Sequence, residues 1–572
     1  MTRLKSQLTV LSIIIAHSIF SQGLDYTWAE GTLGSDFQAI ANAKTDNFGN
    51  TYVLGYHRNT EFTIGGESVP YLGSTLQEGH LVKITPNGEV EWTKSFGQLM
   101  LSGYNMEDLA IDEFGNVYWV GNVLAFFTAP VIDGIEIPMY GNFIQGIIVK
   151  INPDGTTEWI KGVLSENVTA ALSKIDRIDI DSSGNLVMIG TFTGQLDMDG
   201  DILTSSGDTE DAFIAKADSD GNLLWGFSFG SEFGRNIVGD IVANSDDEIF
   251  VSTVWTGNSI VVGNFTEENP DAEVLSNYDR LIAKFSSDGT PIWTSREGSV
   301  EEDFITELVA DDEGGVISVA ESQGEITINE TNYDISGTFL SVYNFEGGSA
   351  SVTQISTASA YIDLINPTYP IGIARDGSGN LVVMITSTDE SVDIGGITLA
   401  NSGGDFGTYD IFLASIAPNG TANWAQVIGT DDNEYGEALS PNGNGGYLIG
   451  GDFFGFDLTI GDFVLENAGF PERSYFITST DEVLSVFNQE RVQPLSVYPN
   501  PATDRVIVDI PVGTAPDQLL SVFDMMGKKV HEQRINQVGK MEVELGSLPN
   551  GIYSIAITGA ERVYSTKLIV SN

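Results

Sequence analysis

The chain alternates short apolar segments with polar turns, and this pattern repeats along most of its length. Typical apolar segments are NVYWVGN at 116–122 and NLVMIGT at 185–191. The turns between such segments contain Asn-Gly or Asp-Gly, whose residues tolerate positive φ and favour tight hairpins. No segment has the three-to-four-residue periodicity of an amphipathic helix. The pattern therefore predicts an all-β protein built from short antiparallel strands.

One turn recurs about every 66 residues and defines seven units between Gly49 and Gly445. In each unit the turn leads into an apolar strand, a hairpin, a further strand and a last strand. Trp lies in that last strand, four residues after a turn glycine, in five units (Gly88 and Trp92 are one pair). The recurrent turn reads DNFGN at 46–50, DEFGN at 112–116, DSSGN at 181–185 and DGSGN at 376–380, with weaker copies at 245–248, 311–314 and 442–445. Because a small sheet cannot bury both faces alone, the units are expected to stack as a seven-bladed β-propeller over residues 22–490.

Closing such a ring requires one strand from outside the seven units. Trp28 is in phase with the tryptophans of the units although no unit precedes it, and Val486 stands where the seventh unit would have its Trp. We therefore expect the strand around Trp28 to complete the last blade. The alternative is that residues 482–487 form that strand and Trp28 lies outside it.

The C-terminal segment has a different pattern, with VYPNPATDRVIVDIP, LLSVFDMMGKKV, VELGSLPNGIYSIAIT and STKLIVSN in succession. These short alternating strands predict a small Ig-like β-sandwich over residues 491–572. The segment resembles the type A sorting domain of the type IX secretion system of Bacteroidetes. The matching residues are Tyr498, Pro499, Asn500, Pro501, Asp524, Gly527, Leu548, Gly551, Tyr553, Lys567 and Leu568. The resemblance implies that this domain contacts the type IX secretion machinery and that the protein is released from the cell or attached to its surface.

The N-terminus predicts a route through the periplasm. Arg3 and Lys5 precede a mostly apolar run from Leu8 to Phe20, which as a helix would span ~20 Å of a ~30 Å hydrocarbon core. We expect residues 1–21 to be a removable signal peptide, with a buried N-terminal helix as the alternative. No other segment reaches 18 apolar residues, so no transmembrane span is expected.

Composition narrows the chemistry further. Lys and Arg number 25 against 80 Asp and Glu, a formal net charge of −55. Residues 23–490 hold 15 basic and 72 acidic side chains, so this region alone carries −57. Such a surface repels phosphate backbones, which excludes nucleic acid as a partner. The chain has no cysteine, so disulfides, thiolate catalysis and Cys-ligated metals are ruled out.

Only one segment suggests a cofactor. Asp197, Asp199 and Asp201 alternate like the first ligands of a Ca²⁺ loop. Other units have a hairpin turn at this position, and the more distant Glu of such a loop is missing, so an ordinary turn is the competing interpretation. No cofactor is therefore expected, and weak Ca²⁺ binding at these residues is the alternative.

Catalytic motifs are missing from the repeats. Residues 23–490 contain two histidines, His57 and His80, and no GxSxG motif, so a serine triad is not expected and both are placed in loops or at the rim. Glycoside cleavage needs two carboxylates, which the sequence cannot select among so many. Trp255 and the cluster 453–456 could stack on sugars, but they are expected to be core. The lysines that recur at one strand position predict a structural pairing; they are Lys83, Lys150, Lys216 and Lys284.

These observations favour a secreted or surface-attached propeller that serves as a non-catalytic binding or adhesion module. Its expected ligand is a polysaccharide or a surface protein. The alternative is a carboxylate-dependent polysaccharide hydrolase or lyase, and a purely structural exoprotein is a third reading. A propeller fold does not discriminate among these three functions, because propellers host many functions.

Overall fold

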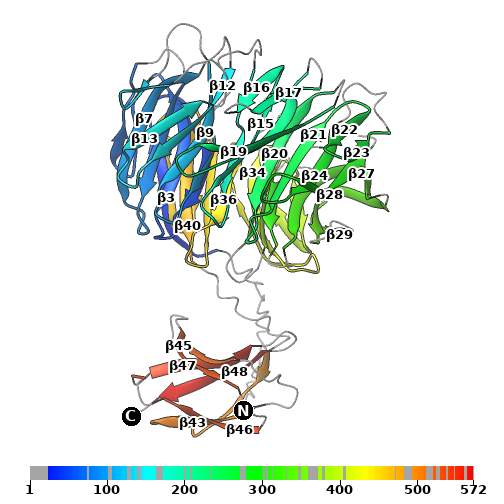
Figure 1. Ribbon diagram of the computed structural model, residues 1–572. Coiled ribbons are helices and arrows are strands. Elements are labelled where there is room, and N and C mark those ends of the chain that lie inside the picture. The colour runs from blue at the N-terminus through cyan, green and yellow to red at the C-terminus, as the bar shows by residue number, and fades with distance from the viewer. Residues whose placement is uncertain are drawn as a thin grey trace, which may run out of the picture. The chain divides into compact units, whose positions relative to one another are not determined.

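The computed structural model divides the chain into two compact units, Met1–Val483 and Leu484–Asn572 (Figure 1). All regular elements of the described residues are β-strands. The predicted signal peptide and the predicted boundary at 490/491 lie outside the described residues. The structure describes residues 24–570 except for 74–76, 101–105, 125–130, 138–143, 163–171, 199–200, 207–208, 232–233, 271–277, 300–302, 304–306, 312–313, 330, 345–349, 358–370, 376–380, 404–406, 470–471, 482–491, 511–518, 524–528, 536–538, 546–547, 550 and 559–562.

The first unit is propeller-like, with groups of four antiparallel strands that follow one another along the chain. The first three groups are β2 (Gln38–Thr45), β3 (Thr51–Arg58), β6 (Gln77–Ile84) and β7 (Val90–Met100); β8 (Met106–Ile111), β9 (Val117–Leu124), β12 (Ile144–Ile151) and β13 (Thr157–Gly162); and β14 (Arg177–Ile180), β15 (Leu186–Phe192), β18 (Asp211–Ala217) and β19 (Leu223–Phe229). The next two are joined into one eight-stranded sheet, because β25 also pairs with β27. They are β20 (Asn236–Ala243), β21 (Ile249–Trp255), β24 (Asp279–Phe285) and β25 (Pro291–Ser299); and β26 (Glu307–Ala310), β27 (Val316–Ile328), β28 (Thr331–Tyr343) and β29 (Ala350–Gln354). The last two are β30 (Ile371–Arg375), β31 (Leu381–Ser387), β34 (Asp410–Ile416) and β35 (Ala422–Ile428); and β36 (Glu434–Pro441), β37 (Tyr447–Phe453), β40 (Ser474–Thr480) and β1 (Tyr26–Leu33).

Short hairpins interrupt most groups between their second and third strands. The exception is the fifth group, where β27 and β28 are each 13 residues long and form one continuous hairpin. The short hairpins are β4 (Phe62–Ile64) with β5 (Glu67–Val69), β10 (Val131–Ile132) with β11 (Ile135–Glu136), β16 (Gln195–Met198) with β17 (Asp201–Thr204), β22 (Ser259–Val262) with β23 (Phe265–Glu268), β32 (Ser391–Ile394) with β33 (Ile397–Ala400), and β38 (Asp457–Ile460) with β39 (Phe463–Glu466).

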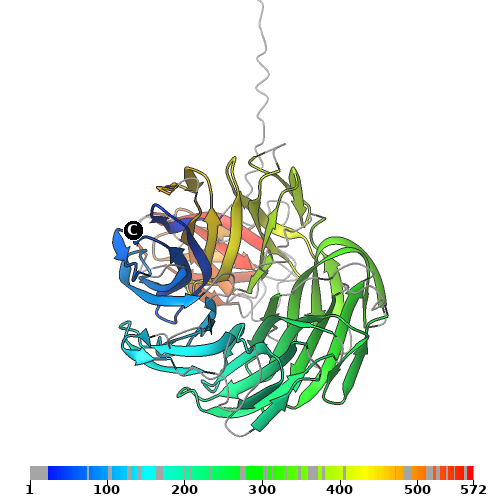
Figure 2. The same ribbon diagram turned by 90° about the horizontal axis from the view of Figure 1, so that it is seen from above.

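The groups are set around a common centre in chain order, as Figure 2 shows from above. The first strand of each group is nearest this centre and contacts the first strand of the next group, from β2 and β8 through to β30 and β36. β36 in turn lies beside β2. The recurrent turn joins the first strand of a group to its second strand, so all the described copies of this turn lie at one end of the sheets. We call this end the turn face.

The pairing expected for the segment around Trp28 is confirmed. β1 runs antiparallel to β40 with Trp28 opposite Ser479, and the Trp28 carbonyl accepts a hydrogen bond from Thr478 Oγ1 at 2.6 Å. The competing segment, residues 482–487, lies outside the described residues. The first and last parts of the unit are therefore held in one sheet.

The regular spacing of Gly and Trp has a packing cause. Four turn glycines of this set have positive φ and lie against a Trp ring of the preceding group, so that an added Cβ would fall 2.7–3.2 Å from the ring. The fifth, Gly420, lies against Thr353 instead. Side chains larger than hydrogen would have to displace the ring. The pairs are Gly88 with Trp28, Gly155 with Trp92, Gly221 with Trp159, and Gly289 with Trp225.

The second unit has two sheets on one apolar core. The five-stranded sheet has the order β41 (Val492–Pro494), β48 (Val563–Val570), β47 (Gly551–Thr558), β44 (Leu519–Phe523) and β45 (Lys529–Arg534). The three-stranded sheet has the order β42 (Ser496–Tyr498), β43 (Arg505–Ile510) and β46 (Gly539–Glu544). Val508 of one sheet and Leu520 and Ile555 of the other are fully buried in the shared core. The Ig-like topology itself stays a prediction.

Candidate functional site

A cavity of about 640 Å³ opens on the turn face among the first three groups. Its walls come from the end of β2, the turn at 112–116, the start of β9 and the turn at 181–185. This volume is within the range of small-ligand sites. The lining is mixed in character and includes Lys44, Asp112, Phe114, Tyr118, Asp181 and Ser182.

The aspartates of this cavity are committed to their own turns. Asp112 Oδ1 accepts hydrogen bonds from the backbone N–H groups of Phe114 (3.0 Å) and Asn116 (2.8 Å), and Oδ2 accepts one from Asn116 Nδ2 (2.8 Å). Asp46 and Asp181 make the same set of contacts in their turns. The Asp and the Asn of the repeated turn are therefore structural, because they hold its backbone in place.

The Tyr118 hydroxyl joins two groups at the cavity wall. It donates to Asp112 Oδ2 at 3.2 Å or to the Ser219 carbonyl at 3.3 Å. Burial, and then the nearby Asp112 carboxylate, raise the pKa of Tyr118 well above its usual range, so the hydroxyl keeps its proton. The Lys150 ammonium lies 5.5 Å from the centre of the Tyr118 ring and forms an ion pair with Glu158 at 3.2 Å.

The structural pairing predicted for the recurrent lysines is confirmed. Lys83 pairs with Glu91 at 3.0 Å and Lys150 with Glu158, both of which are partly exposed carboxylates on the last strand of the group. Lys216 instead reaches the buried Asp181 at 2.6 Å, and Lys284 reaches Glu248 at 2.8 Å. The first two groups have Tyr on the second strand over this position, whereas the third has Val187, which leaves the path to Asp181 open.

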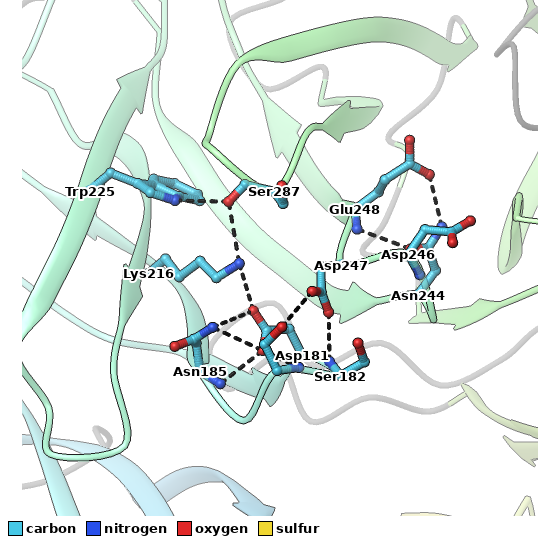
Figure 3. A network of polar contacts seen from close by, with 11 residues as sticks. Asp181, Ser182, Asn185, Lys216, Trp225, Asn244, Asp246, Asp247, Glu248 and Ser287 are labelled. Carbon is cyan, nitrogen blue, oxygen red and sulfur yellow. Dashed lines mark hydrogen bonds and ion pairs between the residues drawn. The ribbon is translucent and has the colours of Figure 1, made fainter.

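The turns of the third and fourth groups are tied to each other, as Figure 3 shows. Asp247 accepts hydrogen bonds from Ser182 N at 2.8 Å and from Ser183 Oγ at 2.7 Å. Lys216 Nζ and Trp225 Nε1 both donate to the Ser287 carbonyl of the fourth group, at 3.3 and 3.1 Å. We call these contacts the inter-turn latch.

Behind the cavity, carboxylates near the common centre also join successive groups. Each accepts a backbone N–H from the first strand of the next group: Asp108 from Ile178, Asp179 from Ala243, Asp240 from Leu308 and Glu307 from Ile373, at 2.9–3.2 Å. Burial raises the pKa of Asp240 to about 6 and that of Glu307 to about 8. Both carboxyls therefore hold a proton closer to neutral pH than an exposed carboxyl does.

The predicted Ca²⁺ ligands are only partly covered by the structure. Asp197 lies on β16 opposite Ile202, and Asp201 begins β17 opposite Met198, so Asp197 and Asp201 are not cross-strand partners. Asp199 lies outside the described residues. Among the residues that the structure describes, no three His, Cys, Asp or Glu side chains are grouped as metal ligands. The Ca²⁺ site stays a prediction.

The expected position of the histidines was wrong. His57 lies on β3 and His80 on β6, and both are fully buried rather than at a rim. Their Nδ1 atoms are 3.3 Å apart, and His80 Nε2 is 3.0 Å from the hydroxyl of Tyr475. Burial lowers the pKa of His57 to about 4, so the ring is neutral at neutral pH. The pair belongs to the core and does not line the cavity.

The aromatic residues divide into core and surface. Trp255 and Phe453 are fully buried, as expected, but Phe456 is 67% exposed. Two further exposed rings, Phe48 and Phe114, were not singled out from the sequence. The available signal was their position, because the recurrent turn has Phe there in only the first two units.

The sorting residues lie in the second unit. The hydroxyl of Tyr553 on β47 donates to the Pro549 carbonyl at 2.8 Å, and Asn500 Oδ1 accepts from Ile569 N at 2.8 Å. Tyr498 ends β42, Gly551 begins β47, and Lys567 lies on β48 opposite Ser554. Pro499 and Pro501 follow cis peptide bonds. Asp524 and Gly527 lie outside the described residues.

Comparison with known proteins identifies the second unit. Residues 496–571 match the family described as the secretion system C-terminal sorting domain. The chain therefore carries a type IX sorting domain, as its sequence motifs suggest, and it is a protein that is secreted or attached to the cell surface. Within the described residues no helix has the length and apolar character of a membrane span.

The chain also has more distant similarities. The chain is 25% identical over 266 residues to ulvan lyase NLR42 of Nonlabens ulvanivorans. The aligned region covers 41% of this chain and 48% of the relative. The chain thus spans about half the length of this relative. Among solved structures, a protein of unknown function from Dyadobacter fermentans is 9% identical with a TM-score of 0.36, covering 79% of this chain and 98% of that one. A mutant of the NanB sialidase from Streptococcus pneumoniae is 12% identical with a TM-score of 0.33, covering 80% and 70%.

Proposed function

We propose that residues 22–490 form a seven-bladed β-propeller that acts outside the cell as a non-catalytic binding module. Seven groups of four strands and the pairing of β1 with β40 support the blade number. The cavity on the turn face carries the functional part of the proposal. Its aspartates serve the turns and its lysine Lys150 is paired, so the site offers surfaces for binding but no prepared nucleophile or base.

The domain division belongs to the same proposal. Residues 1–21 are a signal peptide, and residues 491–572 are an Ig-like sandwich that serves only export and attachment. Deleting residues 496–572 is expected to leave the protein in the periplasm, which fractionation and immunoblotting would measure. Unchanged secretion of the shortened chain would contradict this division of labour.

The binding site can be tested by filling the cavity. Ser182 is exposed and lines the cavity, whereas Ser245 has the equivalent position in the next turn and does not line it. Ser182→Trp in the secreted protein is expected to reduce binding to polysaccharides on an array at least tenfold, and Ser245→Trp is the matched control. Equal binding by the two variants would remove the cavity from the proposal.

A second candidate is a carboxylate-dependent polysaccharide hydrolase or lyase, which the similarity to an ulvan lyase favours. Glu307 is one candidate acid near the common centre, although it does not line the cavity, because burial raises its pKa to about 8 and keeps it protonated at neutral pH. The test is release of reducing ends or unsaturated products from ulvan and other polysaccharides. Turnover that disappears in Glu307→Gln, with the fold intact by circular dichroism, would replace the binding proposal.

A further inference from the structure

Two phenylalanines on the turn face have no role in the fold. Phe48 is 64% exposed and Phe114 is 68% exposed. They occupy the third position of the recurrent turn, where other units have Ser183 or Asn444. Because the turn is held by its Asp, Asn and Gly, the third residue is free to vary. Exposed aromatic rings that the fold does not require point to a contact with something else.

The two rings lie together at the edge of the cavity. Phe114 is part of the cavity wall. Phe48 reaches across from the preceding turn, since a Cβ placed on Gly115 would lie 3.8 Å from Phe48 Cε2. The turns are also joined by Tyr52, whose hydroxyl donates to the Gly115 carbonyl at 3.3 Å. The rings therefore form one apolar rim above a polar cavity, and we call this rim the Phe platform.

Apart from the exposed Glu113, the charged side chains that line the cavity are already compensated. Lys44 is 3.3 Å from Asp108, and Lys150 is 3.2 Å from Glu158. The carboxylate oxygens of Asp112 accept hydrogen bonds from donors of its own turn. Those of Asp181 also accept from turn donors and form an ion pair with Lys216. An anionic ligand would meet no unpaired cation here and would also face a region with a formal charge of −57. A cationic ligand would have to compete with the donors that these carboxylates already have.

We propose that the ligand of this site is an uncharged polysaccharide, with sugar rings stacked on the Phe platform and hydroxyls directed into the cavity. This inference rests on the proposed binding function and names its ligand class. The apolar face of a sugar ring suits an exposed aromatic ring, and its hydroxyls can both donate and accept among the Ser, Thr and Tyr groups of the lining. The volume of about 640 Å³ accommodates one or two sugar units.

The test uses the full secreted chain and three classes of probe. Laminarin, mannan and xyloglucan represent uncharged polysaccharides, alginate and ulvan represent anionic ones, and oligolysine represents a basic peptide. We expect binding only to an uncharged polymer, with a Kd that changes less than twofold between 50 and 500 mM NaCl, because no charges are exchanged. Phe48→Ser and Phe114→Ser are each expected to weaken this binding at least tenfold. Phe456→Ser is the matched control, since this ring is equally exposed and does not line the cavity.

The outcomes separate the ligand class from the site. Binding to alginate, ulvan or oligolysine that Ser182→Trp abolishes would overturn the uncharged ligand and leave the binding function in place. Binding of an uncharged polymer that Ser182→Trp abolishes but both Phe variants retain would overturn the Phe platform. Failure of every probe to bind would overturn both the ligand class and the proposed function. Thermal melts of all variants confirm that each retains its fold.

Discussion

The turn face has two halves that are built from the same repeated turn and used differently. The turns of the first two units expose Phe48 and Phe114, and the cavity opens between the turns of the second and third units. In the third and fourth units the turns are joined by Asp247, which accepts hydrogen bonds from the neighbouring turn (Figure 3). One half is open and the other is closed by the inter-turn latch.

The difference shows how a repeat separates structure from function. The Asp and Asn of the turn are saturated in both halves, so the turn backbone is the same. What varies are side chains that make none of these hydrogen bonds, namely Phe48 and Phe114 at the third position and Asp247 at the position of the turn glycine. These side chains decide whether neighbouring turns bond to each other or present a surface. The lysines follow the same division, since Lys150 pairs with a half-exposed carboxylate and Lys216 with a buried one.

The lysines provide the largest expected contrast between the halves. Lys216→Met leaves the buried Asp181 without its cation and is expected to cost about 3–5 kcal/mol of unfolding free energy. Lys150→Met is the matched change in the open half, where Glu158 is 41% exposed, and is expected to cost about 0–1 kcal/mol. Urea unfolding followed by Trp fluorescence measures both. Equal losses would mean that the two halves are held in the same way.

The next effect contrasts the turn face with the opposite end of the sheets, where Glu434 begins β36. Burial raises the pKa of Glu434 to about 8, against opposing hydrogen bonds from Thr430. Its contribution to stability is complete below the unfolded value of about 4.5 and is lost as pH rises through 8. The free energy of unfolding of Glu434→Gln, compared with that of the native chain, should therefore rise by on the order of 3 kcal/mol between pH 4 and pH 9. A difference that does not change with pH would contradict this.

The stability contributed by the inter-turn latch changes with pH in the opposite direction to that of Glu434. Burial raises the pKa of Asp247, but hydrogen bonds from Ser182 and Ser183 outweigh it and hold the pKa below its usual value. Its stabilising effect is present above pH 4 and is lost as pH falls through the folded pKa. Asp247→Ala should cost about 2–3 kcal/mol at pH 7, because it removes both hydrogen bonds and leaves a side chain at φ 62°. Asp247→Gly relieves the backbone and should cost about 1 kcal/mol; no measurable loss in either variant would show that these hydrogen bonds do not stabilise the fold.

The smallest effect is expected in the open half. Phe48→Ser and Phe114→Ser should change the free energy of unfolding by less than about 0.5 kcal/mol, because both rings are mostly exposed. Denaturant titration beside the binding assay separates the two properties. A loss of several kcal/mol would instead make these rings part of the fold.

Much of the fold could be predicted from local chemistry. The spacing of Gly88 from Trp92 repeats because four of the turn glycines receive the Trp of the preceding group, whereas Gly420 lies against Thr353. The phase of Trp28 predicted its pairing with the last group for the same reason. The sorting motif was readable because its strands carry specific residues at fixed spacing, such as Tyr498 and Tyr553.

The site was less predictable because it depends on contacts between units. His57 and His80 are polar residues on strands whose neighbours, Phe62 and Tyr475, cover them from adjacent sheets, and no local pattern reveals this. The cavity likewise combines residues from three units. The Phe at the third turn position was visible in the sequence, but its exposure follows only from knowing that the turn bonds are satisfied without it.

The pairing of β1 with β40 has a consequence for life outside the cell. It fastens residues about 450 positions apart without a covalent bond, in a chain that has no cysteine. A loop of this length is costly to close, but once it is closed neither strand is a loose end from which unfolding can begin. The pairing of β1 with β40 also persists in reducing surroundings, in which a disulfide would be broken. The protein thus obtains the persistence of a cross-link from a strand that can be assembled only after nearly the whole unit has been made.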